Sequence, residues 1–204
     1  TSSVTDMSNM FNSASAFNQN IGGWITDSVS YMSYMFSDAI AFNKDIGGWN
    51  TLNVTNMSYM FSNAISFDRD IGSWKVSNVT DMMHMFSMAT IFNQDIGGWN
   101  TIKVTDMSYM FDQASTFNHN IGNWNTSSVI NMEGMFRKAI TFNQNIGGWN
   151  TSNVNYMSYM FNEASGFNQD LSGWCVTKIT SEPTDFSLYS SLIESYKPIW
   201  GACP

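Results

Sequence analysis

The two histidines are the side chains of this sequence best suited to catalysis. A histidine acts as a general base or a metal ligand when a cysteine, serine or carboxylate stands at a suitable spacing. Neither His84 nor His119 has such neighbours, and no phosphate-binding glycine loop or His-Glu-x-x-His motif occurs. We therefore expect surface histidines, no cofactor and no catalytic activity.

Three aspartates at one regular spacing, Asp45, Asp70 and Asp95, are the candidates for metal chemistry. If they stack roughly 5 Å apart, their carboxylates repel by about 3 kcal/mol per pair at an effective dielectric near 20. A calcium ion could relieve this repulsion. The equivalent positions elsewhere are Asn20, Asn120, Asn145 and Asp170. Asparagine supports an Asx turn as well as aspartate does, so calcium is the weaker interpretation and we predict no metal.

These columns of equivalent residues exist because the whole chain repeats with one period, the interval from one tryptophan to the next. The tryptophans that set this period are Trp24, Trp49, Trp74, Trp99, Trp124, Trp149 and Trp174. Met-Phe pairs keep the same spacing, from Met10-Phe11 to Met160-Phe161, with no insertion. An unbroken period predicts seven coils of one shape over residues 1–174, each stacked on its neighbours.

The apolar pattern within one repeat predicts a helix and a strand. A two-turn helix would have its inner residues at i, i+3, i+4 and i+7, as do Met57, Met60, Phe61 and Ala64. Thr55 stands at the position of an N-cap. The segment 49–54 alternates as a short strand does, and strands one coil apart form a parallel sheet. The predicted fold is an α/β repeat solenoid with short parallel strands on one face and short helices on the other.

One repeat also resembles known families. The spacing Ile46-x-x-Trp49-x-Thr51-x-x-Val54 follows the strand signature of leucine-rich repeats, with valine where that family usually has asparagine. The unit from Phe42 to Phe61 resembles the repeat of BspA-like surface proteins, and the resemblance covers residues 1–174. It implies a leucine-rich-repeat-like solenoid on secreted or surface-anchored proteins, often linked to adhesion. It implies no particular ligand.

The repeat fails after Trp174. Apolar residues between Asp185 and Tyr196 have helical spacing and stop at Pro198, which predicts that residues 175–204 form a C-terminal capping element. A disulfide between Cys175 and Cys203 would tie this cap to the last coil, with two buried free thiols as the alternative. A disulfide indicates an oxidising compartment, so we expect a secreted or cell-surface protein.

Composition narrows the range of partners. Charged residues make up 12% of the chain, the net charge is -8, and no basic cluster occurs, which argues against nucleic acid. No apolar run is long enough to predict a membrane span. The sequence begins at Thr1 without a signal peptide, so we expect a processed piece of a longer precursor. No predicted cap covers the first coil, which suggests end-to-end self-association through that coil.

The leading functional hypothesis is a binding or adhesion module for a protein or glycan. Its predicted site is the concave face, at Asn50, Leu52, Lys75, Ser77, Asn100, Ile102, Asn125, Ser127, Asn150 and Ser152. The alternative is a structural spacer or filament that assembles end to end. Ice binding by the column of Thr51 is a minor possibility, although we expect its hydroxyls to face the core. A column of asparagines through Asn43 suggests either recognition or, preferably, a ladder of amides between coils.

Overall fold

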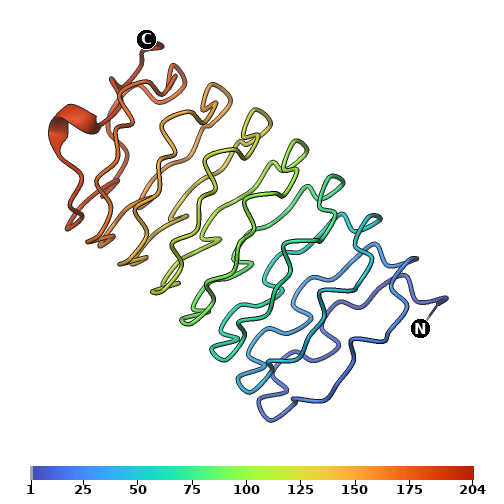
Figure 1. The fold of residues 1–204 in the computed structure, drawn as a ribbon. Helices are drawn as coiled ribbons and strands as arrows, with labels where there is room; N and C mark the ends of the chain where they lie inside the picture. Colours follow the sequence, from blue (N-terminus) through green and yellow to red (C-terminus); the bar gives the residue numbers. More distant parts are fainter. Residues whose placement is uncertain (1) are drawn as a thin grey trace.

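A chain that repeats with one period and no insertions can bury its apolar columns by laying each coil on the next. The computed structural model describes residues 2–204 and shows this arrangement, with consecutive coils side by side and the two termini at opposite ends of the stack (Figure 1). Six parallel bridges join equivalent residues of neighbouring coils, from Asp6–Tyr31 to Asn131–Tyr156.

The predicted α/β solenoid is wrong. Among residues 2–204 the only helical element is the 3-10 helix η1, Glu194–Tyr196. The six bridges are isolated and join into no strand, so the described chain has neither a sheet nor an α-helix. Each coil is instead built from a series of tight turns.

The segment predicted as a helix, 57–64, is a run of such turns. Within the coil, the N–H of Met60 donates to the Met57 carbonyl (3.2 Å) and that of Ser62 to the Tyr59 carbonyl (3.1 Å). The alternate N–H groups donate to the next coil: Tyr59 to the Met83 carbonyl (2.8 Å), Phe61 to that of Met85 (2.9 Å) and Asn63 to that of Ser87 (2.7 Å). This ladder takes the place of the i to i−4 bonds of a helix.

Backbone geometry explains why the helix does not form. Tyr59 and Asn63 have φ values of 58° and 56°, and the equivalent residues of most other coils are also left-handed. Such residues do not belong to a right-handed helix. A two-turn helix is unstable by itself, whereas the neighbouring coil offers a carbonyl to every second N–H. Stacking therefore determines the local structure and overrides the apolar period.

The segment predicted as a strand, 49–54, is also a turn. The N–H of Val54 donates to the Thr51 carbonyl (3.0 Å), which closes the chain on itself. The parallel bridges fall further along, at the column of Asn56. Trp49 and Thr51 lie on the inside of this turn and are 3% and 0% exposed. Their alternation therefore reflects burial within a turn and does not indicate a sheet.

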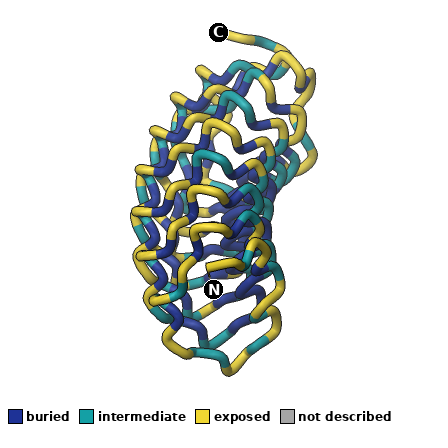
Figure 2. Tube along the Cα trace, turned by 90° about the vertical axis from the view of Figure 1, so that its right-hand side faces the viewer, coloured by how far each residue is buried: buried dark blue, intermediate teal, exposed yellow. Residues whose placement is uncertain are grey.

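Columns of aromatic rings fill the interior. Trp49 stacks on Trp74 with ring centroids 6.5 Å apart, and Phe36 stacks on Phe61 at 5.6 Å. Each indole N–H from Trp49 to Trp174 donates to a carbonyl of the preceding coil at 3.1–3.2 Å. Buried segments face the inside of the coils and exposed segments form the outer turns (Figure 2). The core is thus one continuous column of stacked layers.

Polar ladders also join the coils. The side-chain oxygen of Asn43 accepts the backbone N–H of Asp68, and this bond repeats along the column at 2.9–3.1 Å. The predicted ladder between coils is confirmed. The Thr51 hydroxyl is buried and donates to the Lys75 carbonyl (3.2 Å). The predicted inward orientation is also confirmed, and it removes the hydroxyl surface that ice binding requires.

The residues after Trp174 form an eighth, irregular coil in place of the predicted amphipathic helix. They accept the next step of the backbone ladder: Tyr159 N–H donates to the Thr184 carbonyl, Phe161 to that of Phe186 and Glu163 to that of Leu188 (2.8–2.9 Å). The predicted disulfide between Cys175 and Cys203 is present. It closes a chain segment with a sequence separation of 28 and fixes this last coil to the stack.

Removing one indole should be costly because two neighbouring coils line the cavity that it leaves. We predict that Trp99→Ala lowers the free energy of unfolding by about 3–5 kcal/mol, measured by urea or thermal denaturation. Trp99 is 3% exposed, stacks on Trp124 and donates to the Ile71 carbonyl. The control is Ile102→Ala, since Ile102 is 45% exposed. Equal effects of the two substitutions would contradict this packing.

Candidate functional site

The predicted partner-binding residues lie in the outer turn that follows each buried tryptophan, and no sheet supports them. All are exposed or half-buried: Asn50, Leu52, Lys75, Ser77, Asn100, Ile102, Asn125, Ser127, Asn150 and Ser152. We call these positions the turn row. The turns of successive coils stack on one another, so equivalent side chains line up along the length of the molecule.

The asparagines of the turn row also shape the turn. The side-chain oxygen of Asn125 accepts the N–H of Ser127 (3.0 Å) and its hydroxyl (2.6 Å). Asn50, Asn100 and Asn150 each accept the N–H two residues later in the same way. This Asx turn fixes the asparagine side chain before any partner arrives. The row is therefore a pre-ordered series of amides.

Two features of the row interrupt this pattern of amides. Lys75 stands in the asparagine column, and Val76 follows it where most coils have threonine. Leu52 and Ile102 are apolar yet 46% and 45% exposed. The row is thus uneven in charge and polarity, while most columns beneath it keep their residue types.

A second surface is a ladder of half-buried rings. Tyr34 stacks on Tyr59 (4.4 Å between centroids), Tyr59 on His84 (4.5 Å) and His84 on Tyr109 (4.8 Å). The ladder ends where Gly134 replaces the ring, and a Cβ atom there would collide with the Tyr109 ring. The faces of these rings are covered by their neighbours, so mainly ring edges are open to a partner.

The electrostatics of the ring ladder favour neutral side chains. Burial lowers the pKa of His84 below its usual value, although Asp112 and Asp106 act in the opposite direction. Burial, together with a hydrogen bond from the Tyr109 hydroxyl to Glu133 (2.8 Å), raises the pKa of Tyr109 to about 12. Both side chains are uncharged at neutral pH, and His84, predicted as a surface residue, is half-buried in the ladder.

Beside the ring ladder runs the column of bridge residues, which is mostly aspartate and asparagine and was not predicted from the sequence as a site. Asp81 and Asp106 are adjacent in this column and are flanked by Asn56 and Asn131, whose amides donate to their carboxylates (3.3 Å each). Burial and then the charge of Asp106 raise the pKa of Asp81, against the hydrogen bond from the Met83 N–H. The signal was available, because two aspartates one full period apart must lie in adjacent coils.

An ion pair that was not predicted from the sequence joins two coils. Arg137 Nε and Nη2 contact the two carboxylate oxygens of Asp112 at 2.8 and 3.0 Å, and the Asp112 side chain is 5% exposed. The guanidinium also lies over the Tyr109 ring, 5.9 Å from its centroid. This fork-to-fork contact satisfies the buried carboxylate and is structural.

The candidate calcium residues behave as Asx turns. One carboxylate oxygen of Asp45, Asp70 and Asp95 accepts the N–H of the glycine two residues later (2.9–3.0 Å). The asparagines of this column make the same bond. In the described chain, no three histidine, cysteine or acidic side chains converge as a metal site would require. His119 is half-buried in a different turn.

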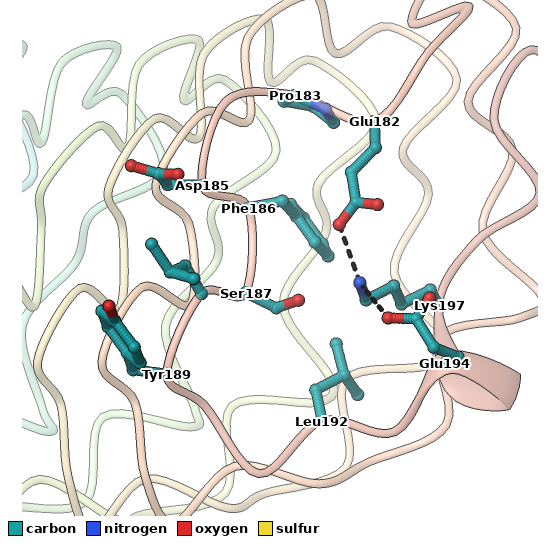
Figure 3. A pocket seen from close by; sticks show the side chains of 10 residues that line it. Glu182, Pro183, Asp185, Phe186, Ser187, Tyr189, Leu192, Glu194 and Lys197 are labelled. Carbon is teal, nitrogen blue, oxygen red and sulfur yellow. Dashed lines mark hydrogen bonds and ion pairs between the residues drawn. The ribbon is translucent and has the colours of Figure 1, made fainter.

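A hollow of about 360 Å³ lies in the last coil, lined in part by Phe186, Leu192 and Lys197 (Figure 3). The Lys197 ammonium lies between Glu182 (2.8 Å) and Glu194 (2.6 Å). These two carboxylates outweigh the single ammonium, and Asp185 also lines the hollow, so the hollow offers no free cation to a ligand.

Comparison with known proteins places the chain in a family. Residues 1–98 and 84–196 match a family described as Mycoplasma protein of unknown function, DUF285. The chain belongs to this family. A search of curated proteins gave no match. The DUF285 match supports a repeat protein, and it names neither a ligand nor an activity.

The stacked carboxylates generate a pH-dependent prediction. Because the pKa of Asp81 is raised in the folded state, the wild-type chain gains stability from this group as pH falls from neutral toward the unfolded pKa near 4. Asp81→Asn keeps an acceptor for Met83 and removes the charge repulsion with Asp106, although it replaces the oxygen that accepts the long bond from Asn56. We expect it to stabilise the protein by about 0.5–1 kcal/mol at pH 7.

The stabilisation by Asp81→Asn should be smaller at pH 4, because Asp81 of the wild type is then largely protonated. Thermal melts of both proteins at pH 7 and pH 4 measure the difference. Asp45→Asn is the control, since Asp45 is exposed and should show little change. A loss of stability on Asp81→Asn at pH 7 would contradict the repulsion between the two carboxylates.

Proposed function

We propose that this chain is a non-catalytic binding module, secreted or on a cell surface, that presents the turn row to a protein or glycan partner. The observation that carries the proposal is the contrast between the row and its support. The row varies among asparagine, lysine, serine, leucine and isoleucine, whereas the Trp, Phe and Ala columns beneath it do not vary.

The rigidity of the turns supports this role. Below each turn, a buried threonine hydroxyl donates to the next coil at 2.9–3.2 Å in five of the coils. Within the turn, the asparagine oxygen holds the N–H two residues later. Side chains held in this way lose little entropy on binding. Several weak contacts at one-coil intervals can then act together.

The proposed location rests on separate observations. The Cys175–Cys203 disulfide fits an oxidising compartment. The resemblance of each repeat to BspA-like surface proteins also favours a surface-exposed protein with a role in adhesion. Among the described residues the structure contains no helix of the length and hydrophobicity that a membrane crossing needs.

A structural role in end-to-end assembly is the second candidate. At the first coil, the carbonyls of Ser8, Met10 and Asn12 accept no hydrogen bond from any described residue. At the last coil, the N–H groups of Asp185, Ser187 and Tyr189 donate to none within residues 2–204. These carbonyls and these N–H groups each belong to every second residue, as do the partners in the ladder between coils. Analytical ultracentrifugation across a range of concentrations distinguishes this candidate from a monomeric binding module.

The turn row can be tested by changing its charge without breaking its turns. The variant combines Lys75→Glu, Asn100→Asp and Asn150→Asp, and both aspartates keep the Asx acceptors. After a glycan and surface-protein screen has identified a partner, we expect binding to fall at least tenfold. Stability should change by only about 0.5 kcal/mol per substitution, because these residues are exposed.

The matched control changes the ring ladder at two positions, Tyr34→Ser and Tyr59→Ser. If the control loses the partner and the turn-row variant keeps it, the face is wrong although the binding role survives. If neither variant affects binding and the protein self-associates, the structural role replaces the proposal.

A further inference from the structure

The repeat is broken at the turn that follows Trp74, and the break leaves a backbone acceptor open. In five coils a threonine hydroxyl donates to a carbonyl of the following turn: Thr26 to Asn50, Thr51 to Lys75, Thr101 to Asn125, Thr126 to Asn150 and Thr151 to Cys175. Val76 occupies this column and has no hydroxyl. By equivalence with the other coils, a hydroxyl at position 76 would donate to the Asn100 carbonyl. That carbonyl accepts no hydrogen bond from residues 2–204.

A free cation lies at the same turn. Lys75 replaces the asparagine of the turn row, and its backbone is held by the Thr51 hydroxyl (2.9 Å). Its side-chain ammonium makes no ion pair or hydrogen bond with any residue that the structure describes. Lys197 in the last coil is in contrast paired with two carboxylates. Lys75 is therefore the charged group of the turn row that is available to a ligand.

These two departures from the repeat line one hollow. It has a volume of about 200 Å³ and is lined by Trp74, Lys75, Val76, Ser77, Gly98 and Asn100, among others. Trp74 and Val76 are 3% and 1% exposed, so they close the floor of the hollow. Gly98 leaves open space, since a Cβ atom there would meet nothing within 4 Å. Lys75, Ser77 and Asn100 contribute a cation, a hydroxyl and an amide.

The lining defines the chemistry of the occupant. Binding sites for drug-sized molecules have about 300–1,000 Å³, so this smaller hollow suits a single ring-sized group. The Asn100 carbonyl has no donor within the described chain and favours a ligand that donates a hydrogen bond, such as a hydroxyl. The Lys75 ammonium favours an anion, and a carboxylate there forms a charge-assisted bond. The open space at Gly98 leaves room for a ring above the closed floor of the hollow.

We propose that the hollow at Lys75 and Val76 binds a carboxylate-bearing sugar residue. The inference rests on the proposed function and names the class of ligand that the turn row recognises at this point. The carboxylate contacts Lys75, a sugar hydroxyl donates to the Asn100 carbonyl, and the ring occupies the space beside Gly98. A single open site of this size binds weakly, with a Kd of about 1 mM, and gains strength from neighbouring turns.

The test restores the repeat at each position separately. Lys75→Asn and Val76→Thr give this turn the residues of the other coils, so both variants should fold as the wild type does. NMR titration with glucuronate should show saturable shifts at Lys75, Ser77 and Asn100 in the wild type. Lys75→Asn should weaken binding at least tenfold. Val76→Thr should weaken it about threefold or more, because the new hydroxyl occupies the Asn100 carbonyl.

The matched control is Lys44→Gln, which removes the same charge elsewhere and introduces the residue found in most other coils at that column. It should bind glucuronate as the wild type does. Methyl glucoside tests the need for the carboxylate, and N-acetylaspartate tests the need for the sugar. No saturable binding of glucuronate, equal loss in Lys75→Asn and Lys44→Gln, or equal binding of either comparison ligand would overturn the inference.

Failure of this inference differs from failure of the proposed function. If the turn-row variant loses its partner while the wild type does not bind glucuronate, only the ligand class is wrong. If the wild type binds glucuronate while the turn-row variant still binds its partner, the hollow is a binding site but the turn row is not the partner-binding surface.

Discussion

The structure depends on the donation of every second backbone N–H to the next coil. In the segment that follows each parallel bridge, alternate donors are used in this way, as at Tyr59, Phe61 and Asn63. The residues between them close tight turns within the coil. A buried backbone that satisfies its polar groups in this manner needs neither a helix nor a sheet. Every coil then relies on its neighbour, as expected of a repeat protein.

This close stacking imposes its own sequence requirements. A Cβ atom on Gly47 would lie 2.6 Å from the Asp70 carbonyl of the next coil, so the column must be glycine wherever a regular coil follows. The seventh coil has Ser172 at this position, because the coil after it is irregular. Gly48 meets nothing within 4 Å, and its column accepts Ser73 and Asn123. The first glycine is thus a packing constraint between coils.

The same stacking links the fold to the proposed function. Rings, amides and hydroxyls of one column are held at one-coil intervals, so any surface position becomes a row. Where the repeat is kept, the row is neutral and its polar groups are largely satisfied within the protein. Where Lys75 and Val76 depart from it, a cation and a carbonyl are left for a ligand. Departures from the repeat are therefore the positions that the proposed binding role would use.

Sequence reasoning predicted the layers and the disulfide but not the backbone. The period of the tryptophans identifies which residues stack and which are buried, as Trp99 and Thr101 confirm. The apolar spacing of Met57, Met60 and Phe61 fits a helix and a run of tight turns equally well. The choice between them is made by hydrogen bonds to residues of the next coil, which local propensity does not contain.

The candidate site shows the same limit. Exposure of the turn row could be predicted from its place between buried columns. The ion pair of Asp112 with Arg137 and the stacked carboxylates Asp81 and Asp106 required attention to neighbours one period apart. The open carbonyl of Asn100 required the hydrogen-bond partner of each threonine, and only the three-dimensional structure provides this.

The most direct test of this account is NMR detection of the hydrogen bond made by Phe61. Scalar coupling across a hydrogen bond links the donor nitrogen with the acceptor carbonyl carbon. The structure predicts coupling between the Phe61 nitrogen and the Met85 carbonyl carbon in the next coil. Coupling of the Phe61 nitrogen to the Met57 carbonyl carbon, four residues earlier, would show an α-helix and contradict the ladder between coils.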